Sequence, residues 1–171
     1  MALDTLISEI DGASRLITEC LHSGAKVLWA GNGGSAADAQ HMAAELVGRF
    51  VTERRGLPSI ALTTDTSAMT AISNDYGFSE VFVRQIEALG NSGDVFVGIS
   101  TSGSSPNIER ALTVARERGL KTIGLTGRSG GSMPSLCDVC IVVPSQVTAR
   151  IQECHILIGH ILCQRVDEAF A

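Results

Sequence analysis

The 171-residue sequence is poor in aromatic side chains, with five Phe, one Tyr and one Trp. Charged residues make up 18% against 44% hydrophobic residues, with no long block of like charge, which excludes a disordered polar chain. No apolar run reaches the roughly 18–20 residues that span a bilayer, and the N-terminal residues lack the pattern of a secretory signal. The net charge of −5 has the wrong sign for binding nucleic acid through bulk charge.

The sequence also contains few cysteines. Five cysteines at wide spacings are an odd number and poor material for a disulfide framework. Cys137 and Cys140 form a C-x-x-C pair, but no second Cys or His pair follows at zinc-binding spacing. We interpret them as structural core cysteines rather than a redox or metal site. These features predict a reduced, cytoplasmic protein that binds neither nucleic acid nor membrane.

Hydrophobic periodicity predicts one α/β domain over residues 1–171. The strands are apolar nearly throughout, which is typical of a parallel sheet covered by helices on both faces. We therefore expect a doubly wound, flavodoxin-like, five-stranded parallel sheet. Ser35, followed by Asp38, predicts a capping box at the start of the second helix. Helices are expected over residues 3–21, 36–50, 67–73, 78–89, 106–118 and 148–170, and strands over 25–30, 57–62, 94–99, 121–125 and 139–143.

Glycine, in contrast, is abundant, with 18 residues. Four predicted strands end in small polar segments, namely GNGGS (31–35), TTDTS (63–67), STSGSS (100–105) and TGRSGG (126–131). Ligands of open α/β sheets bind beyond these strand ends, where hydroxyls and helix N-terminal N–H groups can hold a phosphate. The segments predict phosphate or sugar-phosphate binding, and the alternative is that they only build tight turns.

The same loops argue against a nucleotide. No G-x-x-x-x-G-K-[ST] motif occurs, and Ala36 stands where the dinucleotide fingerprint requires its third glycine. The acidic residue at the expected spacing is Glu53, which precedes the second strand instead of ending it. We expect a small monophosphate ligand and no nucleotide cofactor.

Ionisable residues gather on two predicted helices. Asp38, His41 and Glu45 share one helix face, and the last two have a spacing that suits a metal or an imidazole–carboxylate pair. The alternative is a solvated helix face. On the last helix, Gln152, His155 and His160 interrupt an apolar stretch. We interpret His155 as structural, and spacing alone leaves the role of His160 open.

The segments GNGGSAADAQHMAAELVGRF, ALTTDTSAMTAISNDYGF, VGISTSGSSPNI, LTGRSGG and ARIQECHILIGH resemble the sugar isomerase (SIS) domain family, and within it the isomerases of heptose 7-phosphates. The resemblance implies conversion of sedoheptulose 7-phosphate to D-glycero-D-manno-heptose 7-phosphate through a cis-enediol, the first step of ADP- or GDP-heptose synthesis. It implies Glu45 and His160 as the catalytic acid/base pair. It further implies a homotetramer, with residues 1–24 forming an N-terminal helix that contributes to oligomer packing.

The resemblance also assigns binding residues. It implies one Zn²⁺ per subunit held by His41, Glu45, Gln152 and His160. Phosphate contacts are implied for Ser100, Thr101, Ser102 and Ser105. Further substrate contacts are implied for Asn32, Gly33, Gly34, Ser35, Glu45, Asn74, Asp75 and Gln152.

Two questions stay open at the level of sequence. A zinc-bound Glu45 is a weaker base, so the acid/base and Lewis-acid roles compete. Gln152 and His160 are separated by about 12 Å of helix rise, which predicts a site completed at a subunit interface or a helix bent near Gly159. The alternatives to a heptose phosphate isomerase are an isomerase of another sugar phosphate and a non-enzymatic adaptor of the DnaA initiator-associating type. The adaptor lacks the glutamate that stands here at position 45.

Overall fold

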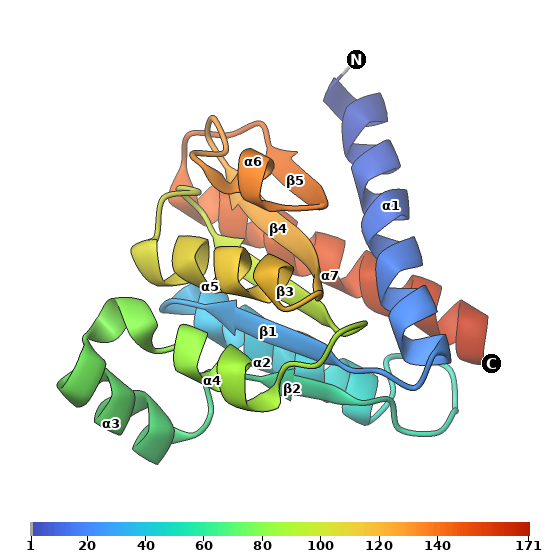
Figure 1. The fold of residues 1–171 in the computed structure, drawn as a ribbon. Coiled ribbons are helices and arrows are strands. Elements are labelled where there is room, and N and C mark those ends of the chain that lie inside the picture. Colours follow the sequence, from blue (N-terminus) through green and yellow to red (C-terminus); the bar gives the residue numbers. More distant parts are fainter. Residues whose placement is uncertain (1) are drawn as a thin grey trace.

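The computed structural model describes residues 2–171, with the side chains of residues 6–171, and Met1 lies outside the described residues. Five parallel strands lie in the order β2-β1-β3-β4-β5 (Figure 1). This is the flavodoxin-like order, so the predicted fold class is confirmed. The strands are β1 (Val27–Gly31), β2 (Ser59–Ala61), β3 (Val95–Ser100), β4 (Lys121–Gly127) and β5 (Val139–Val143).

Helices cover both faces of the sheet (Figure 1). Neighbouring strand residues point to opposite faces, so Trp29 packs in one hydrophobic cluster and Leu28 in the other. The Trp29 side is covered by α1 (Ala2–His22), α2 (Gly34–Val47) and α7 (Thr148–Phe170). The Leu28 side is covered by α4 (Val83–Leu89), α5 (Pro106–Glu117) and the short α6 (Met133–Leu136). In the part of the chain described, no helix is long and apolar enough to cross a membrane.

The start of α2 corrects the predicted capping box. The helix begins at Gly34, and its N-cap is Gly33 with a φ of 57° and no side-chain cap. Ser35 therefore lies buried in the first turn, where its N–H donates to the carbonyl of Asn32. The prediction was wrong because a glycine with positive φ lets the chain enter the helix before the serine. The helix also ends at Val47 instead of residue 50.

The segment predicted as one helix over 78–89 is broken. It forms a 3₁₀ turn, η1 (Phe78–Glu80), followed by α4 from Val83. The preceding helix α3 (Thr66–Tyr76) is longer than predicted and is capped by Asp65, whose carboxylate accepts from the N–H of Ala68 at 2.9 Å. The four-residue α6 was not predicted, because it contains too few residues to show a helical period.

Candidate active site

The chain order reverses between β1 and β3, and the loops that leave these two strands meet there. The loop after β1 leads into α2 on one face, and the loop after β3 leads into α5 on the other. Asn32 and Asn107 join the loops through two reciprocal amide hydrogen bonds of 2.9 and 2.8 Å. Ligands of such sheets bind at this reversal, beyond the carboxyl ends of the strands.

The loop after β3 presents a cluster of hydroxyl groups. The Oγ of Ser100 lies 2.8 Å from that of Ser105 and 3.4 Å from that of Ser102. Ser100 is buried, whereas Thr101, Ser102 and Ser105 are half-buried. A Cβ at Gly103, where φ is 69°, would collide with the backbone of Gly130. Only glycine lets the loops after β3 and β4 pack this closely.

A cavity of about 420 Å³ opens beside these hydroxyls. The predicted residues Asn74 and Asp75 lie exposed at the end of α3, shortly before Phe78 in the cavity wall. The Asn74 amide donates to the Asp75 carboxylate at 2.9 Å. The cavity is lined by Asn32, Phe78, Ser79, Ser104, Ser105, Pro106 and Asn107. The structure thus brings the predicted Asn32 and Ser105 to one cavity.

Three ionisable side chains meet where α2 and α7 pack together, namely His41 and Glu45 from α2 and His160 from α7. The Nε2 of His41 lies 3.0 Å from the Glu45 carboxylate and 3.3 Å from the Nε2 of His160. The ligand atoms of all three residues lie within 4.8 Å of one another. Phe50 packs on the His160 ring, with 5.2 Å between ring centroids. These three side chains, here called the His–Glu–His trio, come from two of the predicted helices and meet in one place.

Glycines set the close approach of α2 and α7. A Cβ at Gly159 would collide with the Met42 thioether, and a Cβ at Gly34 would collide with the Gln152 amide. Residue 34 thus lies beside residue 152, and residue 42 beside residue 159. The residue numbers increase in the same direction along both helices, so the helices run parallel. His41 and His160 each adjoin one partner of the Gly159–Met42 contact, and their imidazoles therefore meet.

The trio is suited to holding a metal ion. A single proton on Nε2 of His41 cannot point along both the line to Glu45 and the line to His160. A tetrahedral zinc ion, in contrast, separates its nitrogen ligands by about 3.3 Å, which follows from Zn–N bonds of about 2.0–2.1 Å. Two imidazoles and a carboxylate also match the donor set of catalytic zinc sites that keep one position open.

The structure places Gln152, the fourth predicted ligand, against Gly34 at the beginning of α2. His41 lies seven residues further along this helix, about 10 Å of helix rise. The α7 helix runs without interruption from Thr148 to Phe170. The assignment of Gln152 to the metal stays a prediction.

The two other polar residues predicted on these helices lie outside the trio. His155 is buried, its Nε2 lies 3.0 Å from the Thr126 carbonyl oxygen, and burial lowers its pKa. It thus fits the structural interpretation. One carboxylate oxygen of Asp38 is buried without a hydrogen-bond partner among the described residues. Burial raises the pKa of Asp38, and attraction by His41 opposes this rise.

Sequence reasoning missed two residues of the site. Asn107 follows the helix-starting Pro106, and nothing in the sequence links it to Asn32. Phe50 follows the end of α2 and packs in a tilted arrangement on a residue of α7. Both contacts join parts of the chain that are distant in sequence, so local spacing carries no signal for them.

Comparison with known proteins identifies the class. The chain belongs to the SIS domain family, whose sequence profile matches residues 2–127. A phosphoheptose isomerase of Aliarcobacter butzleri is 61% identical over 165 residues, which cover 96% of this chain and 87% of that protein. Phosphoheptose isomerase 1 of Campylobacter jejuni is 59% identical, with coverage of 99% and 91%.

Comparison with solved structures leads to the same family. A phosphoheptose isomerase of Neisseria gonorrhoeae superposes with a TM-score of 0.92 at 50% identity, covering 98% of this chain and 89% of that one. Within the SIS domain proteins, the chain is therefore a member of the phosphoheptose isomerase family. This finding supports the isomerase over the adaptor and over isomerases of other sugar phosphates.

Proposed function

We propose that the chain interconverts sedoheptulose 7-phosphate and D-glycero-D-manno-heptose 7-phosphate. The observation that carries the proposal is the meeting of Glu45 with His41 and His160 in a family whose named members are phosphoheptose isomerases. In this proposal the Ser100, Ser102 and Ser105 hydroxyls hold the phosphate. Asn32, with the backbone of the loop after β1, contacts the sugar.

The proposed reaction has two steps, and each step moves one proton on carbon and one on oxygen. The Glu45 carboxylate takes a proton from C1 of the ketose while O2 receives a proton, which forms the cis-enediol. The carboxylate then returns the carbon-bound proton to C2 while O1 loses its proton, which forms the aldose. His160 gives and takes the oxygen-bound protons, so no proton is gained or lost overall. General acid–base catalysis of this kind typically contributes about 10²–10⁴-fold.

The proposed cofactor is one Zn²⁺ per subunit, held by His41, Glu45 and His160 with Gln152 as the fourth ligand. When bound, it would instead supply Lewis acidity that polarises the sugar carbonyl, because a ring nitrogen of His160 that holds the metal cannot carry the oxygen-bound protons. Glu45 is half-buried, with 24% of its side chain exposed, so one of its oxygens can face the sugar while the other faces His41.

The proposal extends to assembly and location. An apolar groove of about 480 Å³ runs between α1, the end of β5 and α7, and Ile7 and Leu157 in it are more than half exposed. These exposed apolar side chains support association with another copy of the chain, and we infer that this association is a homotetramer in which a second subunit completes the site. The five cysteines are free, which supports a reducing, cytoplasmic location. The product then enters heptose synthesis, as in the making of lipopolysaccharide.

The deciding experiment compares the parent chain with Glu45→Gln. Both are incubated with sedoheptulose 7-phosphate, and the sugar phosphates are separated and identified. We expect heptose 7-phosphate from the parent and a kcat lower by about 10²–10⁴-fold in the variant, because the amide keeps the shape but cannot accept the proton. Substrate binding should persist.

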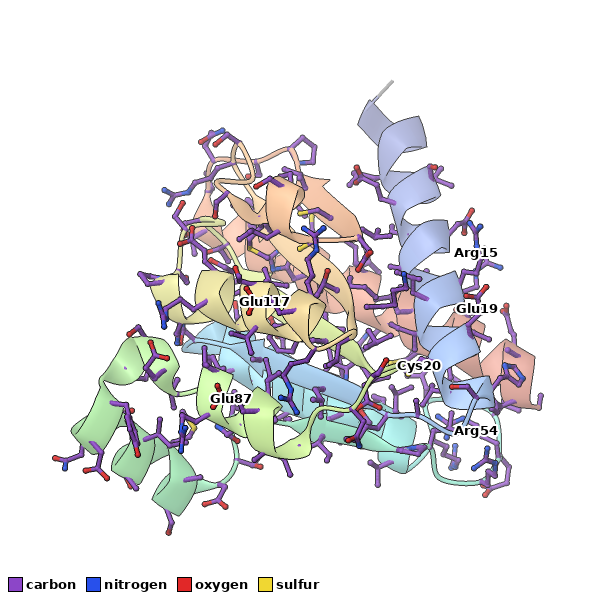
Figure 2. The ribbon with its side chains drawn as sticks, viewed as in Figure 1. Arg15, Glu19, Cys20, Arg54, Glu87 and Glu117 are labelled. Atoms are coloured by element: carbon purple, nitrogen blue, oxygen red, sulfur yellow. The ribbon has the colours of Figure 1, made fainter. Side chains whose placement is uncertain are left out.

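Glu87→Gln is the matched control. Glu87 belongs to an exposed pair with Arg84 on α4, on the opposite face of the sheet from the trio (Figure 2). Its turnover should equal that of the parent. An equally active Glu45→Gln enzyme would refute the assigned base, and a parent chain without isomerase activity would refute the proposed function.

A further inference from the structure

Arg54 and Asp167 form a buried ion pair beside the C-terminal ends of α2 and α7. The Nε of Arg54 donates to Asp167 Oδ1 at 2.7 Å, and the two side chains are only 1% and 2% exposed. Figure 2 shows Arg54 in the loop after α2, beside the C-terminal end of α7. Removing one member of such a pair leaves the other charge buried without a partner, which strongly destabilises the fold. Nothing in the proposed reaction uses either residue.

Arg54 binds the end of the helix that carries Glu45. Its guanidinium donates to the carbonyl oxygens of Glu45 and Leu46 at 3.0 Å each, and to that of Gly48 at 3.3 Å. The last carbonyls of a helix have no partner within it, so the arginine satisfies the groups that end α2. The backbone of Glu45 is therefore tied directly to the ion pair.

Asp167 binds the loop that carries Arg54. Its Oδ2 accepts from the backbone N–H groups of Val51 and Thr52 at 2.8 Å each. Burial alone would raise its pKa, but these two bonds and the Arg54 guanidinium outweigh burial and hold the pKa below its ordinary value. The carboxylate is thus charged at neutral pH and fixes the loop to α7.

The pair is connected to both helices of the trio. Asp167 lies seven residues, two helical turns, after His160, so both residues lie on the same face of α7. We propose that the Arg54–Asp167 pair is a positioning device that holds Glu45 on α2 against His160 on α7. The inference rests on the proposed function, since it assigns the pair a purpose in a reaction carried by Glu45 and His160. A displacement of about 1 Å in such a site can lower the rate about 100-fold.

A second buried ion pair provides a matched control. Lys26 Nζ lies 2.6 Å from Asp94 Oδ2, and the side chains are 19% and 2% exposed. Asp94 also accepts from two backbone N–H groups, those of Lys26 at 3.0 Å and Asn91 at 2.8 Å. These bonds join the loops that precede β1 and β3, and none of them reaches α2 or α7. Asp94→Asn therefore removes a comparable buried charge without touching the trio.

The experiment compares Asp167→Asn, Arg54→Lys and Asp94→Asn with the parent chain. Arg54→Lys keeps the charge but loses the planar fork that binds several oxygens, and it serves if Asp167→Asn does not fold. Thermal unfolding is recorded for each, and kcat and KM are measured well below each midpoint. We expect lower midpoints in all three, but a kcat lower by about 10–100-fold only in the first two. KM should change by less than about 3-fold there, because the phosphate hydroxyls lie at the other end of α2.

A distance measurement separates this inference from the proposed function. The His41 and His160 rings lie 5.1 Å apart between centroids, and a nuclear Overhauser contact between their ring protons reports that proximity. Loss of the contact in Asp167→Asn but not in Asp94→Asn supports the positioning device even if the parent chain proves inactive. Retention of the contact and of full kcat in both Asp167→Asn and Arg54→Lys would overturn it. An equal loss of kcat in Asp94→Asn would also overturn it.

Discussion

The backbone of Gly159 presses so closely on the Met42 side chain that there is no space for a methyl group between them. Gly159→Ala therefore requires either the buried Met42 side chain, which is only 1% exposed, to change its conformation or α7 to move away from α2. Overpacking of this kind costs about 1–3 kcal/mol, equivalent to about 2–4 °C of Tm per kcal/mol in a chain of this length. We expect a lower Tm and a kcat lower by up to about 100-fold, measured by thermal melts and an isomerase assay.

Gly12→Ala is the matched control for this substitution. Gly12 also lies in a helix, but a Cβ there would meet Val139 at 3.5 Å, an ordinary contact. Alanine at such a site stabilises by about 0.4–1 kcal/mol. A Gly159→Ala enzyme with parental Tm and turnover would contradict the importance of this close approach.

Phosphate binding by the loop after β3 is tested with the double variant Ser102→Ala/Ser105→Ala. Each hydrogen bond to a charged group is worth about 1.5–3 kcal/mol, so KM should rise at least about tenfold. Ser135→Ala, which removes an exposed hydroxyl on α6 that donates to the carbonyl of Ser132 just before that helix, should leave KM unchanged. A KM equal to that of the parent in the double variant would refute the assignment of phosphate binding to this loop.

Metal binding by the trio is tested by elemental analysis of untagged protein. We expect up to one zinc per chain in the parent and none in His41→Ala. His22→Ala provides the control, since His22 is exposed on α1 and bonds to the Thr18 carbonyl. Chelation should abolish most activity, and addition of zinc should restore it. Full activity of metal-free protein would show that the carboxylate and imidazole suffice.

The buried His155 predicts how stability depends on pH. Its folded pKa is lowered by burial, so below the ordinary value of 6.5 the unfolded chain binds a proton that the folded chain does not. Its contribution to the free energy of unfolding is thus complete above pH 6.5 and declines as the pH falls toward the folded pKa. Melts between pH 8 and 5 should show a shallower decline for His155→Gln. Parallel curves for parent and variant would contradict this assignment.

Much of the fold could be predicted from the sequence because the strands are nearly continuous apolar runs bounded by turn-forming residues such as glycine, aspartate and proline. Each of the five predicted strands overlaps an observed one. The start of α2 could not be predicted, because the positive φ of Gly33 leaves no sequence signal, whereas Ser35, two residues later, is itself a common N-cap residue. The break before Val83 was missed for a related reason, since the apolar residues on both sides of it keep a helical spacing.

The candidate site was partly predictable. The spacing of His41 and Glu45 along one helix predicts their contact at 3.0 Å. The contact of His41 with His160 joins residues 119 positions apart, and it depends on a glycine that admits Met42. Such packing depends on side-chain volumes in three dimensions and leaves no periodic pattern. The amide pair of Asn32 and Asn107 could not be predicted for the same reason.

The helix α3 buries none of its eleven residues, and it projects from the body of the molecule (Figure 1). An element with so little buried surface opens locally at a small fraction of the global unfolding free energy. After α3 and its C-cap Gly77, the chain continues into Phe78 and Ser79, which line the cavity together with residues of the loop after β3. One wall of the cavity is thus attached to a helix with little buried surface, and amide hydrogen exchange in α3 measures how often that helix opens.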